Sequence, residues 1–172
     1  MKEALHSLRR YWKSVDAIGN ERRLRYYVGS KRSLSMSDFL IFDSYPIISF
    51  LREEKGFQTV EDILKAAIES RTHLVISPIN WGEVYYIVFR TVGEIRAKQA
   101  LRWMDIIGFQ LLSVTSQRVL HAARIKARFP VSYADAFAIA AAQELDCPVV
   151  TGDPEFRRVE QAGVVRLMWV GG

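Results

Sequence analysis

The sequence predicts an α/β fold in which helices cover a central parallel sheet. Short apolar runs alternate with longer segments of helical periodicity, an order typical of βαβ units. The first run, residues 39–43, is brief and uniformly apolar, which indicates a strand buried on both faces. Connections between such strands are right-handed crossovers, so the strands are expected to run parallel.

The 172 residues suit one domain with a substantial core, and 49% hydrophobic and 25% charged residues are ordinary for a globular protein. No apolar run approaches the roughly 18 residues of a membrane span, and the charged N-terminus has no apolar signal core. The single cysteine, Cys147, cannot form an internal disulfide, and its apolar neighbours favour a small buried side chain over a reactive thiol. We therefore expect a cytoplasmic protein without membrane association.

Residues 1–35 differ from the rest of the chain in charge. They hold nine Lys or Arg and three Asp or Glu, whereas residues 36–172 hold 15 and 16. Apolar residues recur at helical spacing over residues 5–15, and residues 29–35 resemble a linker. We expect a basic N-terminal extension, helical or partly disordered, that binds RNA, docks on the core or stays a solvated tail. The main domain would be 36–172, and Met36 is an alternative start of translation.

Strands and helices are expected to alternate from residue 39 onward. The expected strands are 39–43, 74–77, 109–114, 149–151 and 164–167. The expected helices cover 45–54, a segment opening with a capping-box pattern at Thr59, then 80–93, 94–107, 117–128, 132–145 and a short segment around Phe156.

Three acids in the later part of the chain have a structural explanation. Glu83 and Asp135 are the fourth residues of capping-box patterns that begin at Asn80 and Ser132, and Asp153 precedes a proline, as an N-cap residue often does. Such acids stabilise a helix by about 1 kcal/mol each. Taken singly, each acid needs no further role.

Topology favours a shared role for four acids. Asp43 ends the first strand, Glu83 follows the second strand after a short turn, and Asp153 ends another strand. The carboxyl ends of parallel strands meet at one edge of a sheet, and Asp135, at a helix start, can face the same edge. Asp62, in the Thr59 pattern, follows no strand, so capping is its only expected role.

Four neighbouring carboxylates need a cation. Their repulsion costs up to about 4 kcal/mol per close pair near a protein surface. A site of oxygen ligands without His or Cys suits Mg²⁺ or Mn²⁺, which can activate water for attack on a phosphodiester. His6, His73 and His121 have no catalytic motif around them, and the chain has no glycine-rich phosphate loop.

At these residues the chain resembles the PIN-domain family, and most closely the VapC-type toxins of prokaryotic toxin–antitoxin pairs. The resemblance covers nearly all of 36–170 and is most specific in its third and fourth motifs. The motifs are 36–44 (MSDFLIFDS), the helix start at Glu83, 134–140 (ADAFAIA) and 150–156 (VTGDPEF).

The resemblance implies a three-layer α/β/α fold with a central parallel sheet of four to five strands. It also implies a Mg²⁺- or Mn²⁺-dependent endoribonuclease that acts on RNA, forms a homodimer and is inhibited by a cognate antitoxin protein. Asp43, Glu83, Asp135 and Asp153 match the four acidic, metal-binding positions, and Thr151 matches the hydroxyl residue near the site.

Two departures from the family pattern and two alternatives accompany this interpretation. Asn80 stands where Ser or Thr is usual, and residues 1–35 have no counterpart in the minimal pattern. A phosphatase or dehalogenase with an aspartyl nucleophile would need a second Asp at position 45, where Tyr45 stands. A non-catalytic PIN-like RNA-binding or scaffold protein is the other alternative. The arginines at 90, 157 and 158 are candidate phosphate contacts or plain surface charges.

Overall fold

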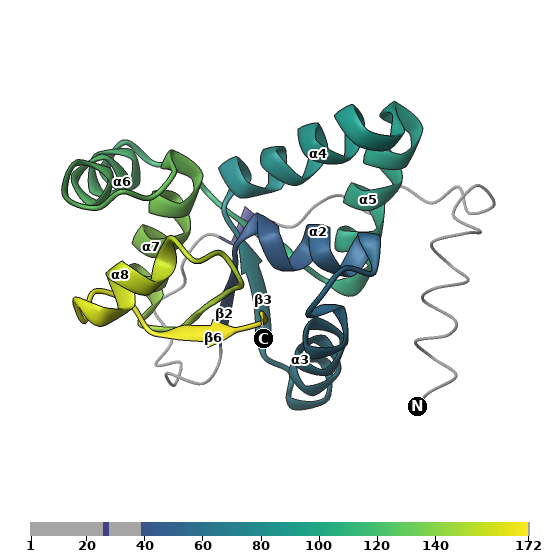
Figure 1. Ribbon diagram of the computed structural model, residues 1–172, viewed down its shortest axis with the longest axis horizontal. Helices are drawn as coiled ribbons and strands as arrows, with labels where there is room; N and C mark the ends of the chain where they lie inside the picture. The colour runs from purple at the N-terminus through teal and green to yellow at the C-terminus, as the bar shows by residue number, and fades with distance from the viewer. Residues whose placement is uncertain (1–25, 28–38, 172) are drawn as a thin grey trace.

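The computed structural model describes residues 26–27 and 39–171, and it confirms the α/β class (Figure 1). All strand pairs are parallel, in the order β1-β4-β3-β2-β5-β6. The strands are β1 (Tyr26–Tyr27), β2 (Phe39–Phe42), β3 (His73–Ile76), β4 (Gln110–Leu112), β5 (Val149–Thr151) and β6 (Leu167–Trp169). Five of them arise from residues 39–171, as expected. The short β1 comes from the expected N-terminal extension, whose other residues, with the helix expected there, lie outside the described part.

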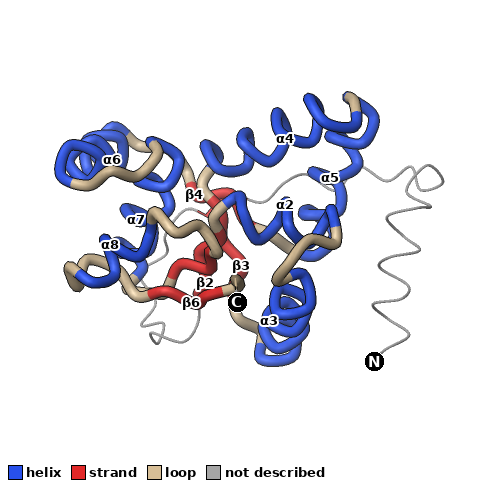
Figure 2. The backbone as a smooth tube through the Cα atoms, in the orientation of Figure 1, coloured by secondary structure: helices blue, strands red, loops and turns tan. Residues whose placement is uncertain are grey.

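Helices cover both faces of the sheet, which completes the three layers (Figure 2). One face carries α2 (Ser44–Arg52), α3 (Phe57–Ser70), α4 (Pro78–Val92) and α5 (Glu94–Ile107). The opposite face carries α6 (Ser116–Arg128), α7 (Tyr133–Leu145) and α8 (Phe156–Gln161).

The central strand β2 is buried on both sides, as its uniform apolarity predicts. Phe39 and Ile41 pack into the core under α6, α7 and α8, whereas Leu40 and Phe42 pack into the core under α2 to α5. Side chains alternate between the two faces of a strand, so one four-residue run serves both cores. The alanine-rich stretch of α7, residues 136–142, is fully buried, and its small side chains let the helix lie close to the sheet.

The order of the strands reverses beside β2. From β2 the chain moves to β3 and β4 through helices on one face, then crosses by α6 and α7 on the other face to β5 and β6. The carboxyl ends of β2 and β5 therefore flank a topological switch point, where open α/β sheets bind their ligands. Asp43 directly follows β2, and Thr151 ends β5.

The capping box expected at Thr59 is wrong. Helix α3 begins at Phe57 and its N-cap is Gly56, with φ of 92° and no side-chain cap. A Cβ at Gly56 would collide with the backbone carbonyl of Val170, so close packing against the chain after β6 places the helix start. Asp62 consequently lies inside the helix, where it pairs with Lys65 at 3.7 Å and caps nothing.

The capping box expected at Asn80 is also wrong. Ser77 is the N-cap of α4, its Oγ accepts from the backbone N of Ile79 at 3.0 Å, and Pro78 occupies the first helical position. Ser followed by Pro is itself an N-terminal pattern, and it moves the helix start three residues upstream. Asn80 thereby enters the first turn and is buried.

Two boundaries near the C-terminus differ from expectation. Asp153 accepts from the backbone N of Glu155 at 2.9 Å, but it caps a turn, and α8 begins only at Phe156. The last strand, expected at 164–167, instead spans Leu167–Trp169, because a turn with Gly163 at φ of 67° occupies the preceding residues.

Other expectations concern single residues and the membrane. Cys147 is buried as expected, and burial raises the pKa of its thiol to about 12. His73 stacks on Phe39 with ring centroids 5.0 Å apart, at the amino ends of β2 and β3 and thus away from Asp43. Among the described residues, no helix combines the length and apolarity needed to cross a membrane.

Candidate active site

Asp43 is the centre of the candidate site. It follows β2 directly and caps α2, because its Oδ1 accepts from the backbone N of Ser44 at 2.7 Å. Asn80 Nδ2 on α4 donates to the same oxygen at 3.1 Å, and Thr151 Oγ1 on β5 donates to Oδ2 at 3.0 Å. The carboxylate is therefore held from three separate elements and is only 1% exposed.

Glu83 joins the site through Ser44. Ser44 Oγ donates to Glu83 Oε2 at 2.8 Å and lies 3.4 Å from Asp43 Oδ1, so one hydroxyl lies between the two acids. The hydroxyl of Tyr86 donates to the other oxygen, Oε1, at 3.2 Å. Partial burial and the Glu83 charge together raise the pKa of Tyr86. Glu83 lies one turn beyond Asn80 on α4, so a single helix supplies two groups to the site.

Asp135 both caps helix α7 and interacts with the other acids. The capping box at the start of α7 is present as expected: Asp135 N donates to Ser132 Oγ at 3.0 Å, and Ser132 N donates to Asp135 Oδ2 at 2.8 Å. Burial raises the pKa of Asp135 to about 6 against the lowering effect of these bonds, and the charges of Asp153 and Glu83 raise it further. Capping therefore does not remove Asp135 from the cluster of acids.

Asp153 is positioned by the turn after β5. Its backbone N donates to Thr151 Oγ1 at 3.1 Å, and the same hydroxyl donates to Asp43. Thr151 thus links the two acids, and a role of its hydroxyl in a reaction stays a prediction. Gly152 between them packs against the ring of Tyr45, where a Cβ would collide with the ring carbons.

The four carboxylates are coupled by charge. Burial raises the pKa of Asp43 to about 7, and the negative charges of Asp135 and Glu83 add to the rise, while the bonds from Ser44 and Thr151 oppose it. Within the described part of the chain, none of the four acids forms an ion pair with a basic side chain. Like charges held together in a buried place favour either protonation or a bound cation.

The donor set fits a hard divalent cation, although the side chains do not form a finished coordination shell. No group of three His, Cys, Asp or Glu side chains in residues 26–27 and 39–171 is arranged to hold a metal ion. The acids nevertheless offer only oxygen atoms, and Asn80 Oδ1 beside them is buried without a hydrogen-bond partner. Oxygen donors and excess negative charge match Mg²⁺ or Mn²⁺.

Ser44 and Asn80 are the site residues that sequence reasoning missed. The sequence pattern predicts only a helix cap for Asn80 and assigns Ser44 no role. The Ser-Pro pair at 77–78 contains the signal for Asn80, since a helix starting there puts position 80 in the first turn. For Ser44 no comparable local signal exists, because its partner Glu83 is 39 residues away.

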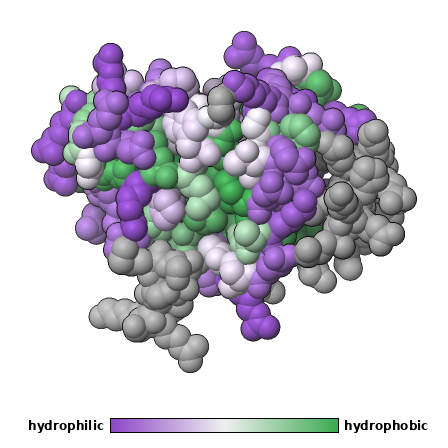
Figure 3. Space-filling model, turned by 60° about the horizontal axis from the view of Figure 1, so that its bottom comes forward, coloured by the Kyte–Doolittle hydropathy of each residue, from purple (hydrophilic) through white to green (hydrophobic). Residues whose placement is uncertain are grey.

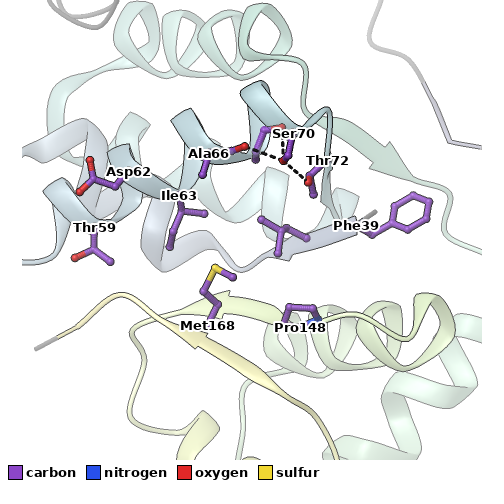
Figure 4. Close-up of a pocket in the computed structure, with 11 residues that line it drawn as sticks. Phe39, Thr59, Asp62, Ile63, Ala66, Ser70, Thr72, Pro148 and Met168 are labelled. Atoms are coloured by element: carbon purple, nitrogen blue, oxygen red, sulfur yellow. Dashed lines mark hydrogen bonds between the residues drawn. The ribbon is translucent and has the colours of Figure 1, made fainter. Parts of the chain in front are cut away.

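An apolar groove lies elsewhere, between α3 and β6 (Figure 4). Its volume is about 600 Å³, and Ile63 of α3 faces Met168 of β6 across it, with Phe39 and Pro148 at its other end. Figure 3 shows hydrophobic surface within a hydrophilic rim on this lower side of the molecule. Phe39 is the first residue of β2, and Pro148 directly precedes β5. The groove therefore reaches the amino ends of these two strands, opposite to the acids.

The fold and the cluster of acids agree with a known protein family. The family model described as PIN domain matches residues 40–162, and the chain belongs to this family. The match contains Asp43, Glu83, Asp135 and Asp153. A search among curated proteins finds no significant match.

Solved structures with the same fold include chains of VapBC complexes and a VapC toxin. A chain of VapBC2 from Rickettsia felis, bound to a DNA fragment from its promoter, is 12% identical with a TM-score of 0.59, covering 76% of this chain and 97% of that one. A chain of DNA-bound VapBC from Salmonella typhimurium is 17% identical with a TM-score of 0.57, and the alignment covers 75% of this chain and 96% of that one. VapC20 from Mycobacterium tuberculosis, a Sarcin-Ricin loop cleaving toxin, is 17% identical with a TM-score of 0.53. The alignment covers 66% of this chain and 91% of that one. At these identities the similarity establishes the fold.

Proposed function

We propose that this protein is a Mg²⁺- or Mn²⁺-dependent endoribonuclease, the toxin of a type II toxin–antitoxin pair. The observation that carries the proposal is the meeting of Asp43, Glu83, Asp135 and Asp153 at the switch point of the sheet. Asp43 and Asp135 are buried, and Glu83 and Asp153 are half-buried. Such acids without basic partners serve poorly as structural residues, but they suit a site that binds a cation and a phosphate. The similar fold of VapC20 from Mycobacterium tuberculosis, a Sarcin-Ricin loop cleaving toxin, supports a cleavage reaction of the same class.

The residues of the chain divide the work at the site. Asp43, Glu83, Asp135 and Asp153 would hold the cation, which supplies charge stabilisation and makes a water more acidic in phosphodiester hydrolysis. Asn80 and Thr151 fix the direction of the Asp43 carboxylate through their 3.1 Å and 3.0 Å hydrogen bonds. Such fixed geometry lowers the reorganisation needed when charge develops on the phosphate.

Ser44 has a comparable task for Glu83. Its hydroxyl orients Glu83 Oε2 and keeps that acid beside Asp43. In hydrolysis, water attacks phosphorus, the bond from phosphorus to the leaving oxygen breaks, and the water gives up a proton. A carboxylate at this cluster can orient that water or accept its proton.

We propose the partner, the location and the oligomeric state from the solved structures of similar fold and from the family resemblance. Structures similar in fold come from VapBC complexes, which supports a cognate antitoxin as partner in the cytoplasm. Residues 36–172 carry 15 basic and 16 acidic side chains, so RNA binding would depend on local arginines and the cation. We further propose a homodimer, following the family resemblance.

The decisive experiment is a ribonuclease assay with purified full-length protein. Wild-type protein should cleave RNA with Mg²⁺ or Mn²⁺ and lose the activity in EDTA, and Asp43→Asn should abolish it. Asp62→Asn is the matched control, since it removes the same charge from the exposed side of α3 and should leave activity unchanged. EDTA-insensitive cleavage, or full activity of Asp43→Asn, contradicts a metal-dependent nuclease.

The alternative is a PIN-like protein that binds RNA or acts as a scaffold without cleavage. The complete set of four acids and the hydrogen bonds that orient Asp43 weigh against it. RNA binding by wild-type protein without cleavage under any divalent cation would favour it. Co-expression with the product of the neighbouring gene tests the partner: a toxin should co-purify with a small protein that suppresses its activity.

A further inference from the structure

Trp169 lies beside the candidate site at the end of the sheet. It is the last residue of β6 and the register partner of Thr151, whose hydroxyl donates to Asp43. Neighbouring strands are about 4.8 Å apart, and β6 is the second strand from β2. The backbone of Trp169 is therefore roughly 10 Å from that of Asp43, on the same carboxyl edge.

The indole of Trp169 is not a core side chain. Its neighbours on β6 pack inward, Leu167 toward the α7 face and Met168 toward the α3 face. Trp169 belongs to neither of these two clusters and is half-buried. Its clearest neighbour is Arg157 of α8, whose guanidinium carbon lies 4.6 Å from the ring centroid.

Arg157 is held by this stacking and by the turn that carries Asp153. Its backbone N donates to the carbonyl of Pro154 at 3.1 Å, which ties it to the same loop. The side chain is exposed, and among the described residues its guanidinium forms no hydrogen bond or ion pair. The guanidinium lies over the indole ring without a hydrogen bond to a described residue, so its five N–H groups remain available to a ligand.

We propose that Trp169 and Arg157 form a stacking platform for an unpaired base of the RNA substrate. The proposal rests on the ribonuclease function and adds a binding subsite next to it. A base would stack on the indole or on the guanidinium plane, as in single-strand recognition, while the guanidinium N–H groups contact an adjacent phosphate. In a duplex the base faces are covered by neighbouring bases, so the platform selects single-stranded or looped RNA.

The negative charge around the candidate site makes such a stacking platform useful for binding RNA. Four acids surround the cleavage position, and the main domain has no net positive charge to attract RNA. A pre-positioned arginine with an aromatic support supplies affinity next to the acids without neutralising them. Stacking is tolerant of sequence, because every base has a π-face.

Binding measured apart from cleavage tests the platform. The full-length Asp43→Asn protein in Mg²⁺ buffer is titrated into a fluorescein-labelled short RNA, once single-stranded and once annealed to its complement. Adding Trp169→Ala should raise the Kd for the single strand by about 5- to 150-fold, the range expected for loss of one stacked base. Trp169→Phe should cost less, and Arg157→Gln should also weaken single-strand binding.

Arg166→Gln is the matched control for Arg157→Gln. Arg166 carries the same charge, immediately precedes β6 at the opposite edge, and bonds to Asp146 at 3.1 Å. Its substitution should change the Kd by less than twofold. Thermal unfolding of each variant checks that β6 remains folded, and Trp169→Phe with Arg157→Gln keeps the test valid if Trp169→Ala unfolds.

The outcomes separate the two proposals. If wild-type protein cleaves RNA but Trp169→Phe and Arg157→Gln bind the single strand as tightly as the parent, the platform alone is overturned. Equal losses for single strand and duplex also overturn it, because they indicate a plain phosphate contact. If wild-type protein neither binds nor cleaves RNA, the ribonuclease function fails and the platform with it.

Discussion

Asp43 combines a buried position with three hydrogen-bond donors and two neighbouring acids. The hydrogen-bond donors favour the charged form of Asp43, whereas burial and the charges of Asp135 and Glu83 favour its neutral form. In the protein without a cation, burial and the neighbouring charges prevail, and the pKa of Asp43 is raised. A divalent cation reverses this balance because it favours the carboxylate.

The first residue-scale prediction concerns pH and stability. The pKa of Asp43 rises from an ordinary 3.8 to about 7 on folding, so the folded protein binds the extra proton between these values. Stability from this group is complete below pH 3.8 and is lost as pH rises through 7, by on the order of 4 kcal/mol. In EDTA, the Tm of wild-type protein should fall from pH 5 to pH 8 more steeply than that of Asp43→Asn.

A cation should counter that loss. Mg²⁺ binds the deprotonated acids, so the rise in Tm on adding Mg²⁺ should be larger at pH 8 than at pH 5. Asp62→Asn should behave as wild type in both series. Parallel Tm curves for wild type and Asp43→Asn would show that Asp43 does not titrate as a buried acid.

The second residue-scale prediction concerns Asn80. Asn80→Ala removes the 3.1 Å bond to Asp43 Oδ1 but leaves every acid in place. Because groups that orient a metal ligand typically contribute 10- to 100-fold, cleavage should fall by about that factor. Asn80→Ser keeps a donor and should retain more activity. Steady-state rates at saturating Mg²⁺ measure the effect, and wild-type rates for Asn80→Ala would contradict it.

At the scale of elements, glycine places the start of α3. Gly56 and Gly108 both lie in the left-handed region, with φ of 92° and 99°, but of the two only Gly56 has a neighbour, the Val170 carbonyl, in the space of a Cβ. The start of helix α3 can therefore approach the chain after β6 closely at Gly56.

These two glycines give a matched pair for mutation. Gly108→Ala should lower the free energy of unfolding by about 1–3 kcal/mol through the left-handed backbone alone. Gly56→Ala should lower it by more, since the chain must also separate from Val170. Urea denaturation of both variants measures the difference. Equal losses would mean that the contact with Val170 adjusts without cost.

The position of a helix start also explains why a local capping pattern describes the roles of Glu83 and Asp135 only in part. The pattern at Asn80 places Glu83 in a capping box, but the Ser-Pro N-cap at 77–78 moves the helix start and turns Glu83 toward Ser44. Asp135 does cap α7 and still interacts with Asp153 and Glu83. Capping and participation in a site are thus compatible in one residue.

At the scale of the whole molecule, the switch point locates the site. Strands β3 and β4 extend the sheet on one side of β2, and β5 and β6 extend it on the other. All four acids, and the described residues of both cores, lie within residues 39–171. The segment 1–35 contributes β1, a two-residue strand at the edge beside β4.

A shortened protein tests this division. Residues 36–172 should retain divalent-dependent cleavage, because the acids and their supporting residues are all present. Its Tm should be lower than that of the full chain, since β4 loses its partner β1 and keeps only β3. A folded 36–172 protein without activity, beside an active full-length protein, would assign the N-terminal segment a part in catalysis.

From the sequence alone one can predict the α/β class, five of the strands and the parallel sheet, and select the four acids as candidates for the site. These features follow from local patterns: apolar runs, helical periodicity, and residues placed directly after strands. The capping box at Ser132 was predictable for the same reason, because its partners are three residues apart.

The assembly of the site depends on the packing of elements that are distant in sequence. Asn80 and Thr151 reach Asp43 across 37 and 108 residues of chain, and Ser44 reaches Glu83 across 39. The stacking of Arg157 on Trp169 likewise depends on α8 folding back over β6. Local patterns report on neighbours within a turn or a strand, whereas these contacts arise from the packing of separate elements on one sheet.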